Sequence, residues 1–182
     1  MLAAVLMTRC AGDVSNGEVL SARDADSALL GEARALERFG LVFRAPKDWT
    51  LSAETAPVET ELSGFTVKSE NIFMRDDGIG FCMVSGVRRS DGPTDPDPLK
   101  AYLDIIAERF GGGGDVSYKN LRINGLTGVM FRMTVKDSII YKFIVDANAW
   151  LVQFDFVFPA DEFNDSLLKK MRSSVSTIQE VS

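Results

Sequence analysis

The feature that most constrains this chain is a period-two alternation of side chains between residues 129 and 158. Its apolar positions are Val129, Phe131, Met133 and Val135, then Tyr141, Phe143 and Val145, then Trp150, Val152, Phe154, Phe156 and Phe158. Such alternation is typical of strands that bury one face. The links near 136–138 and 146–148 are short enough to require antiparallel neighbours. The second half of the chain is therefore predicted to form an antiparallel meander.

A second strand pair is predicted upstream of the meander. Residues 65–75 and 79–89 both have strand character and are joined at Asp76-Asp77-Gly78. This link is a hairpin signal because glycine and aspartate tolerate positive φ. The second of these strands carries apolar residues on both faces, which is expected of a central position in a sheet.

Two helices are predicted in the same region. Residues 98–110 have a helical apolar stripe, with Asp97 as N-cap and Pro98 at the first helical position. A last helix is predicted from about Asp161 to Ile178. Strands paired by hairpins, with helices at separate points, indicate an α+β fold with an antiparallel sheet backed by helices.

The first forty residues are expected to lie outside this domain. Residues 1–20 are read as a flexible N-terminal segment or signal remnant. Ser21 and Asp24 have the spacing of a capping box, and apolar residues then recur at helical intervals up to Phe39. An amphipathic helix is therefore predicted over 21–40, followed by a single α+β domain over 41–182.

Cys10 is a candidate for lipid modification. The apolar stretch Met1–Met7 precedes Cys10-Ala-Gly, an order similar to the end of an export signal before a lipidated cysteine. Against this, no basic segment precedes the stretch, and Arg9 stands where a small residue is expected before cleavage. Two locations therefore stay open: a periplasmic or envelope-associated protein, with membrane contact only through this N-terminal anchor, or a cytoplasmic one.

The composition excludes several kinds of chemistry. The chain of 182 residues has no histidine and two cysteines, Cys10 and Cys82. It therefore lacks the parts for serine–histidine or cysteine–histidine catalysis, for most catalytic zinc sites and for a disulfide framework. Its net charge of −6 opposes nucleic-acid binding.

Three short motifs invite a catalytic or metal-binding interpretation, and a simpler one accounts for each. Gly111–Gly114 follows a helix instead of preceding one, so it predicts a connector and not a phosphate loop. Ser166 and Lys169 have Ser-x-x-Lys spacing without the companion motifs. The acids Asp91, Asp95 and Asp97 fit a turn and a helix cap better than a calcium loop. No catalytic, cofactor-binding or metal-binding residue is predicted, no cofactor is expected, and the chain is predicted not to be an enzyme.

Several segments resemble the PsbP-like and DcrB-like proteins. Phe43-Arg-Ala-Pro-Lys-Asp-Trp-Thr50 resembles their opening strand and Pro-x-x-Trp turn, and Asn120-Leu-Arg-Ile-Asn-Gly125 a strand that ends in glycine before a longer strand. The resemblance extends over about residues 41–180. It implies a curved antiparallel β-sheet flanked by helices, an α-β-α sandwich. It also implies non-catalytic relatives such as photosystem II extrinsic subunits, envelope lipoproteins and adaptor chaperones of secretion effectors.

The functional hypothesis is a non-catalytic binding or accessory protein, an exported lipoprotein-like component of the envelope. The alternative is a cytosolic adaptor chaperone of the secretion-effector type. Both hypotheses expect a protein partner and no nucleic acid, and both leave a homodimer open.

Overall fold

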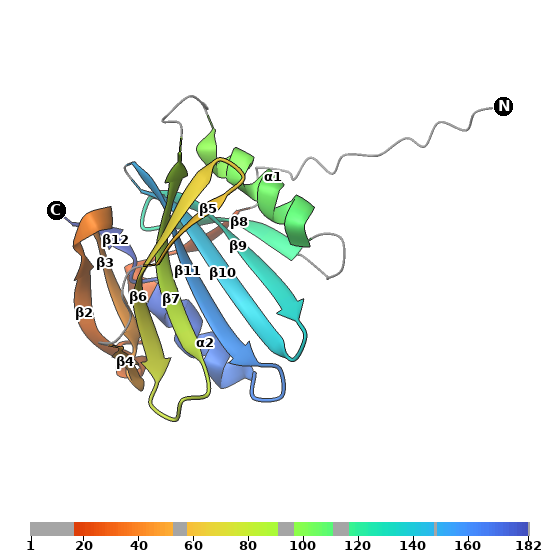
Figure 1. Cartoon of the computed structure of the whole chain (residues 1–182). Coiled ribbons are helices and arrows are strands. Elements are labelled where there is room, and N and C mark those ends of the chain that lie inside the picture. Colours follow the sequence, from red (N-terminus) through yellow and green to blue (C-terminus); the bar gives the residue numbers. More distant parts are fainter. Residues whose placement is uncertain (1–16, 53–57, 91–96, 111–116, 148, 182) are drawn as a thin grey trace.

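The computed structural model describes residues 17–52, 58–90, 97–110, 117–147 and 149–181 (Figure 1). The helices are α1 (Pro98–Phe110) and α2 (Asp165–Val175). The strands are β1 (Glu18–Leu20), β2 (Leu30–Leu36), β3 (Leu41–Pro46), β4 (Trp49–Leu51), β5 (Val58–Leu62), β6 (Phe65–Arg75), β7 (Phe81–Arg89), β8 (Ser117–Ile123), β9 (Leu126–Val135), β10 (Ser138–Ala147), β11 (Trp150–Pro159) and β12 (Gln179–Glu180).

The strands form two sheets. The larger has the order β1-β8-β9-β10-β11-β7-β6-β4, with β5 also paired to β6, and the smaller has the order β12-β3-β2. Strands β9, β10 and β11 are antiparallel neighbours, as the alternation predicts, and β8 is antiparallel to β9. The pair β1–β8 is parallel, so the large sheet is mixed and not purely antiparallel. The α+β class is confirmed.

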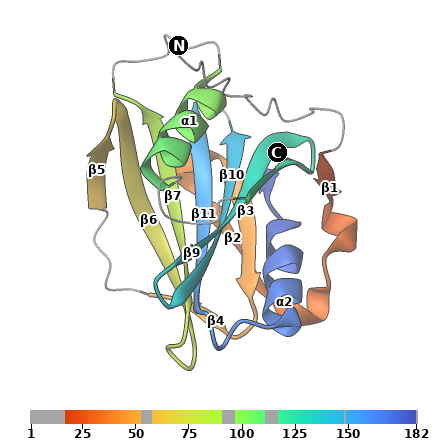
Figure 2. The same ribbon diagram turned by 90° about the vertical axis from the view of Figure 1, so that its right-hand side faces the viewer.

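Each face of the large sheet carries its own hydrophobic core. Helix α1 packs on one face through Leu99, Tyr102 and Ile106. Helix α2 packs on the other face together with the small sheet, and this core contains all three phenylalanines of β11. Figure 2 shows the two helices on opposite sides of the strands. The second layer is thus part helix and part sheet, so the expected α-β-α sandwich is realised only in part.

The predicted hairpin and the predicted start of α1 are confirmed. The β6–β7 turn has Gly78 at φ 75°, and the Ile79 amide donates to Asp77 Oδ1 at 2.9 Å. Asp97 Oδ1 caps α1 by accepting from the Lys100 amide at 2.9 Å. Helix α2 starts later than predicted, at Asp165, because the Asn164 side chain caps it by accepting from the Leu167 amide.

The helix predicted over residues 21–40 is wrong. The capping box of Ser21 and Asp24 forms, but it starts only a 3-10 turn over Ala22–Asp24. Residues Leu30–Leu36 are the strand β2, which pairs antiparallel with β3. Hydrogen bonding to a neighbouring strand outweighs a modest helical pattern here, and within β2 only the end residues Leu30 and Leu36 are buried. Strand β5 likewise has no counterpart among the predicted elements.

The N-terminal segment contributes to the core through Phe39, which packs edge-on against Trp150 at 5.6 Å between ring centroids. Both rings lie over Gly86, where a Cβ would overlap them. Trp150 is half-buried, whereas Trp49 is only 6% exposed and packs against Phe156.

Gly128 marks a close approach of two strands. A Cβ at this position would lie 2.5 Å from the carbonyl oxygen of Ile144 on β10. Because the obstacle is backbone, we expect Gly128→Ala to destabilise the protein by about 1–3 kcal/mol. Urea unfolding measures the change. Gly31→Ala is the matched control, since no atom lies closer than 3.4 Å to its Cβ; equal effects of the two substitutions would contradict the steric argument.

Candidate functional site

One row of apolar side chains crosses the large sheet close to its hairpin ends. The row consists of Met74 on β6, Phe81 on β7, Val157 on β11, Ile140 on β10 and Met133 on β9. Each member is the direct cross-strand partner of the next, so all five point to the same face. We call this set the apolar row.

The apolar row lies on the same face as α1 but outside its core. Further along the same strands, Val87, Leu151 and Ile144 belong to the core under α1, whereas no member of the row belongs to either core cluster. Met133 is buried and the other four are half-buried. In Figure 1 α1 crosses the end of this face opposite to the β6–β7 and β9–β10 turns. No described helix crosses this face at the end where those two turns lie. The apolar row is therefore a largely half-buried apolar strip that belongs to neither core and that no described helix covers.

A buried polar network separates the apolar row from the α1 core. Lys142 Nζ donates to Asp155 Oδ2 at 2.7 Å, and Gln153 Nε2 donates to the same oxygen at 3.4 Å. Gln153 Oε1 in turn accepts from the Tyr102 hydroxyl of α1 at 3.0 Å. The Oδ1 atom of Asp155 is buried without a hydrogen-bond partner among the described residues. The network therefore anchors α1 to the sheet and places one ion pair beneath the open surface.

The buried side chains of Tyr102 and Cys82 do not suit acid–base or nucleophilic catalysis. Burial, and then the charge of Asp155, raise the pKa of the Tyr102 phenol well above its usual range. The same two causes, burial first, raise the pKa of the Cys82 thiol. Both groups therefore stay protonated far above neutral pH, whereas an efficient general base or thiolate nucleophile needs a pKa near or below it.

The Cys82 thiol gives a direct test of this burial. Cys82 lies on β7 with its side chain wholly buried, so we expect no reaction with a water-soluble disulfide reagent while the protein is folded. The measurement uses Cys10→Ser, which leaves Cys82 as the only thiol. Full reaction is expected in denaturant, and rapid native labelling at neutral pH would contradict the burial.

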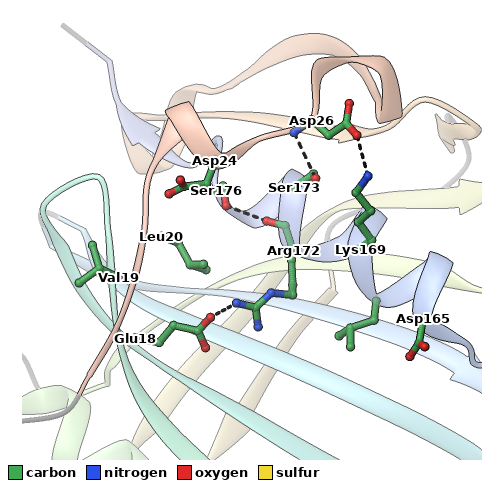
Figure 3. A pocket seen from close by; sticks show the side chains of 11 residues that line it. Glu18, Val19, Leu20, Asp24, Asp26, Asp165, Lys169, Arg172, Ser173 and Ser176 are labelled. Atoms are coloured by element: carbon green, nitrogen blue, oxygen red, sulfur yellow. Dashed lines mark hydrogen bonds and ion pairs between the residues drawn. The ribbon is translucent and has the colours of Figure 1, made fainter.

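A pocket of about 510 Å³ lies between the N-terminal segment and α2 (Figure 3). Its walls carry four carboxylates and two cations: Glu18, Asp24, Asp26, Asp165, Lys169 and Arg172. Most of these groups are engaged with each other. Arg172 forms an ion pair with Glu18, Lys169 lies 2.9 Å from Asp26, and Asp24 accepts from the Ser21 amide.

These contacts hold the N-terminal segment on α2. The hydrogen bond from Lys169, and then the one from the Ala28 amide, lower the pKa of Asp26. The Asp26 amide also donates to Ser173 Oγ at 3.3 Å. The polar side chains of the pocket thus hold the N-terminal residues against α2. The apolar row is the stronger candidate for a partner site.

The described residues of the motifs noted in the sequence form structural contacts. Lys169 pairs with Asp26 across the pocket, so its ammonium is held by a carboxylate and not by Ser166. Asp97 caps α1. Cys10, Gly111–Gly114, Asp91 and Asp95 lie outside the described residues.

The described part of the chain has neither a candidate metal site nor a candidate membrane span. Its Cys, Asp and Glu residues form no group of three or more that could hold a metal ion. No helix in these ranges has the length and hydropathy needed to cross a membrane.

Sequence reasoning missed the apolar row as a surface. The signal was present in β7, whose two apolar faces correctly indicate a central strand. Alternation alone cannot tell which part of the second face a helix covers, because α1 reaches it from elsewhere in the chain.

Comparison with known proteins supports the fold. No protein-family model matches the sequence, and no curated protein does. Among solved structures, the chain is similar to cyanobacterial PsbP (CyanoP) from Synechocystis sp. PCC 6803, with a TM-score of 0.50 and 13% identity. The match covers 82% of this chain and 91% of the cyanobacterial one. The resemblance seen in the sequence is confirmed at the level of the fold: the chain has a PsbP-like fold.

Proposed function

We propose that this protein is a non-catalytic accessory protein that binds a protein partner through the apolar row. The observation that carries the proposal is the row itself, an aligned apolar surface across five strands that belongs to neither core. Contiguous apolar surface outside a core is characteristic of interaction sites.

The test is site-specific photo-crosslinking in cells. A photoreactive phenylalanine analogue at Ile140, within the row, is expected to give a discrete adduct whose partner is identified by mass spectrometry. The same analogue at Val58, which is 61% exposed on β5, is the control for random encounters. The adduct should disappear when Phe81→Lys is added, because a charge in the row opposes desolvation. Equal adducts from both positions, or persistence of the adduct in Phe81→Lys, would exclude the row as the binding surface.

We further propose that the protein is exported and held at the envelope by a lipid on Cys10. The apolar stretch Met1–Met7 before Cys10-Ala-Gly supports this location. Metabolic labelling with a fatty-acid analogue is expected to mark the wild type but not Cys10→Ser. An unlabelled protein in the cytoplasmic fraction would support the alternative, a cytosolic adaptor chaperone. A homodimer is compatible with either location, and light scattering measures it.

A further inference from the structure

Resting on this proposed function, we infer that the segment seated on the apolar row is a basic amphipathic helix of the partner, lying beside α1. The inference joins three properties of the surface: the length of the row, the free sheet next to α1, and the charge of the hairpin ends.

The row has the length of a helix. Its five members lie on adjacent strands, so it extends about 19 Å at the usual spacing of about 4.8 Å between strands. A helix of about 13 residues has the same length at about 1.5 Å per residue. Helix α1 itself has 13 residues and packs on the same strands. The sheet face therefore already accepts one helix of this size.

There is room for a second helix next to the first. On β11, Leu151 lies under α1 and Val157 belongs to the apolar row, six positions further along the strand. This separation corresponds to about 20 Å at about 3.4 Å per residue. Neighbouring helices pack with axes about 8–10 Å apart. A second helix can thus lie over the row without displacing α1.

An extended peptide would fit this surface less well. A strand adds to a sheet by hydrogen bonds along an edge, and the row runs across the middle of the sheet, where the backbone groups of β7, β11 and β10 already pair on both sides. A helix satisfies its own backbone, and it can present an apolar stripe to the row.

The hairpin ends favour a positively charged partner. The turns and loop next to the row carry five exposed carboxylates: Asp76, Asp77, Asp137, Asp161 and Glu162. Among the cations on these strands and turns, Arg75 is engaged by Asp77 and Lys142 by Asp155, and Lys136 stands in the β9–β10 turn. The whole chain has a net charge of −6. Lysine or arginine on the flank of the helix would complement this rim, whereas an acidic flank would be repelled.

The test uses three synthetic helical peptides of about 14 residues, a length that matches the row. The first has a leucine stripe flanked by lysines. The second has the same stripe with glutamate in place of each lysine, and the third has the composition of the first in an order that breaks the stripe. Fluorescence anisotropy with the full chain measures binding at low salt and at higher salt.

The lysine peptide is expected to bind at least about tenfold more tightly than the other two and to weaken as salt increases. Phe81→Lys should abolish this binding, while Val58→Lys, which adds the same charge at an exposed position of β5, should not. Circular dichroism checks that both variants fold. If Phe81→Lys fails to fold, Ile140→Ser, which replaces a half-buried apolar side chain by a small uncharged one, takes its place.

Two outcomes overturn the inference: equal affinity for the lysine and glutamate peptides, or failure of every peptide to bind. If the crosslink from Ile140 is nevertheless specific to the row, the proposed partner surface remains and only the basic helix is excluded. If the crosslink also fails, the proposed function falls with it.

Discussion

Replacing Lys142 with methionine is expected to lower the free energy of unfolding by about 3–5 kcal/mol, the cost of leaving one member of a buried ion pair without its partner. The side chains of Lys142 and Asp155 are only 11% and 9% exposed. Without Lys142, Asp155 Oδ2 would keep only the long contact with Gln153, and Oδ1 has no hydrogen-bond partner among the described residues. The carboxylate would then remain buried with almost no compensation.

The double variant Lys142→Met/Asp155→Leu separates the pair from its local packing. Well-packed apolar replacements of both charges are often neutral or stabilising, so the double variant should recover most or all of the stability. Urea unfolding of the wild type, both single variants and the double variant gives the coupling energy. Lys169→Met, which removes a partner of the exposed Asp26, is a surface control and should shift the midpoint far less. A small effect of Lys142→Met, with no coupling, would show that water reaches the pair.

The double variant also bears on function. Along β10 its apolar face would be continuous from Ile140 of the apolar row to Ile144 of the core under α1, because Lys142 lies between them, while Gln153 would still interrupt β11. We expect it to bind the apolar stripe of a helix at least as tightly as the wild type does. Its discrimination between lysine and glutamate peptides should stay unchanged, since the carboxylates of the hairpin ends are untouched.

The meander could be predicted from sequence because two local signals agree there. Period-two alternation and short links both require antiparallel neighbours in β9, β10 and β11. The hairpin at Asp76–Gly78 and the start of α1 at Pro98 depend equally on residues close together in the chain. Where neighbouring residues determine the conformation, the sequence was enough.

The N-terminal forty residues could not be predicted in this way. Strand β1 pairs in parallel with β8, which is far away in the sequence, and β2 pairs with β3 in an irregular register, so the conformation of both depends on pairing that local patterns do not show. The spacing of Leu29, Leu36 and Phe39 fits a helix by itself, but the chain there alternates between 3-10 turns and strand. The apolar row could not be predicted for a related reason, because its five residues become neighbours only when the five strands pair in register.

Asn124 connects this N-terminal segment to the rest of the fold, and Asn124→Ala is expected to cost about 2–4 kcal/mol. Its side chain accepts from the Ala22 amide at 2.7 Å and donates to the carbonyls of Ser176 and Ile178 at 2.8 and 2.7 Å. One side chain thus joins the N-terminal segment, the β8–β9 turn and the end of α2. Each of these bonds contributes about 0.5–1.5 kcal/mol net, and alanine would add strain at the left-handed φ of 48°.

Asn124→Gly distinguishes the two contributions to that cost. Glycine adopts positive φ without strain, and it already does so next door at Gly125, where φ is 94°. Asn124→Gly should therefore avoid the strain that alanine adds, but it still loses the three side-chain hydrogen bonds. Its unfolding midpoint should fall between those of the wild type and Asn124→Ala. In both variants hydrogen exchange should accelerate at the Ala22 amide, because it loses its acceptor, before it does in the centre of β10. If the Ala22 amide in Asn124→Gly were as protected as in the wild type, backbone pairing alone would hold the segment. The backbone amide of residue 124 would still donate to the Leu20 carbonyl in that variant.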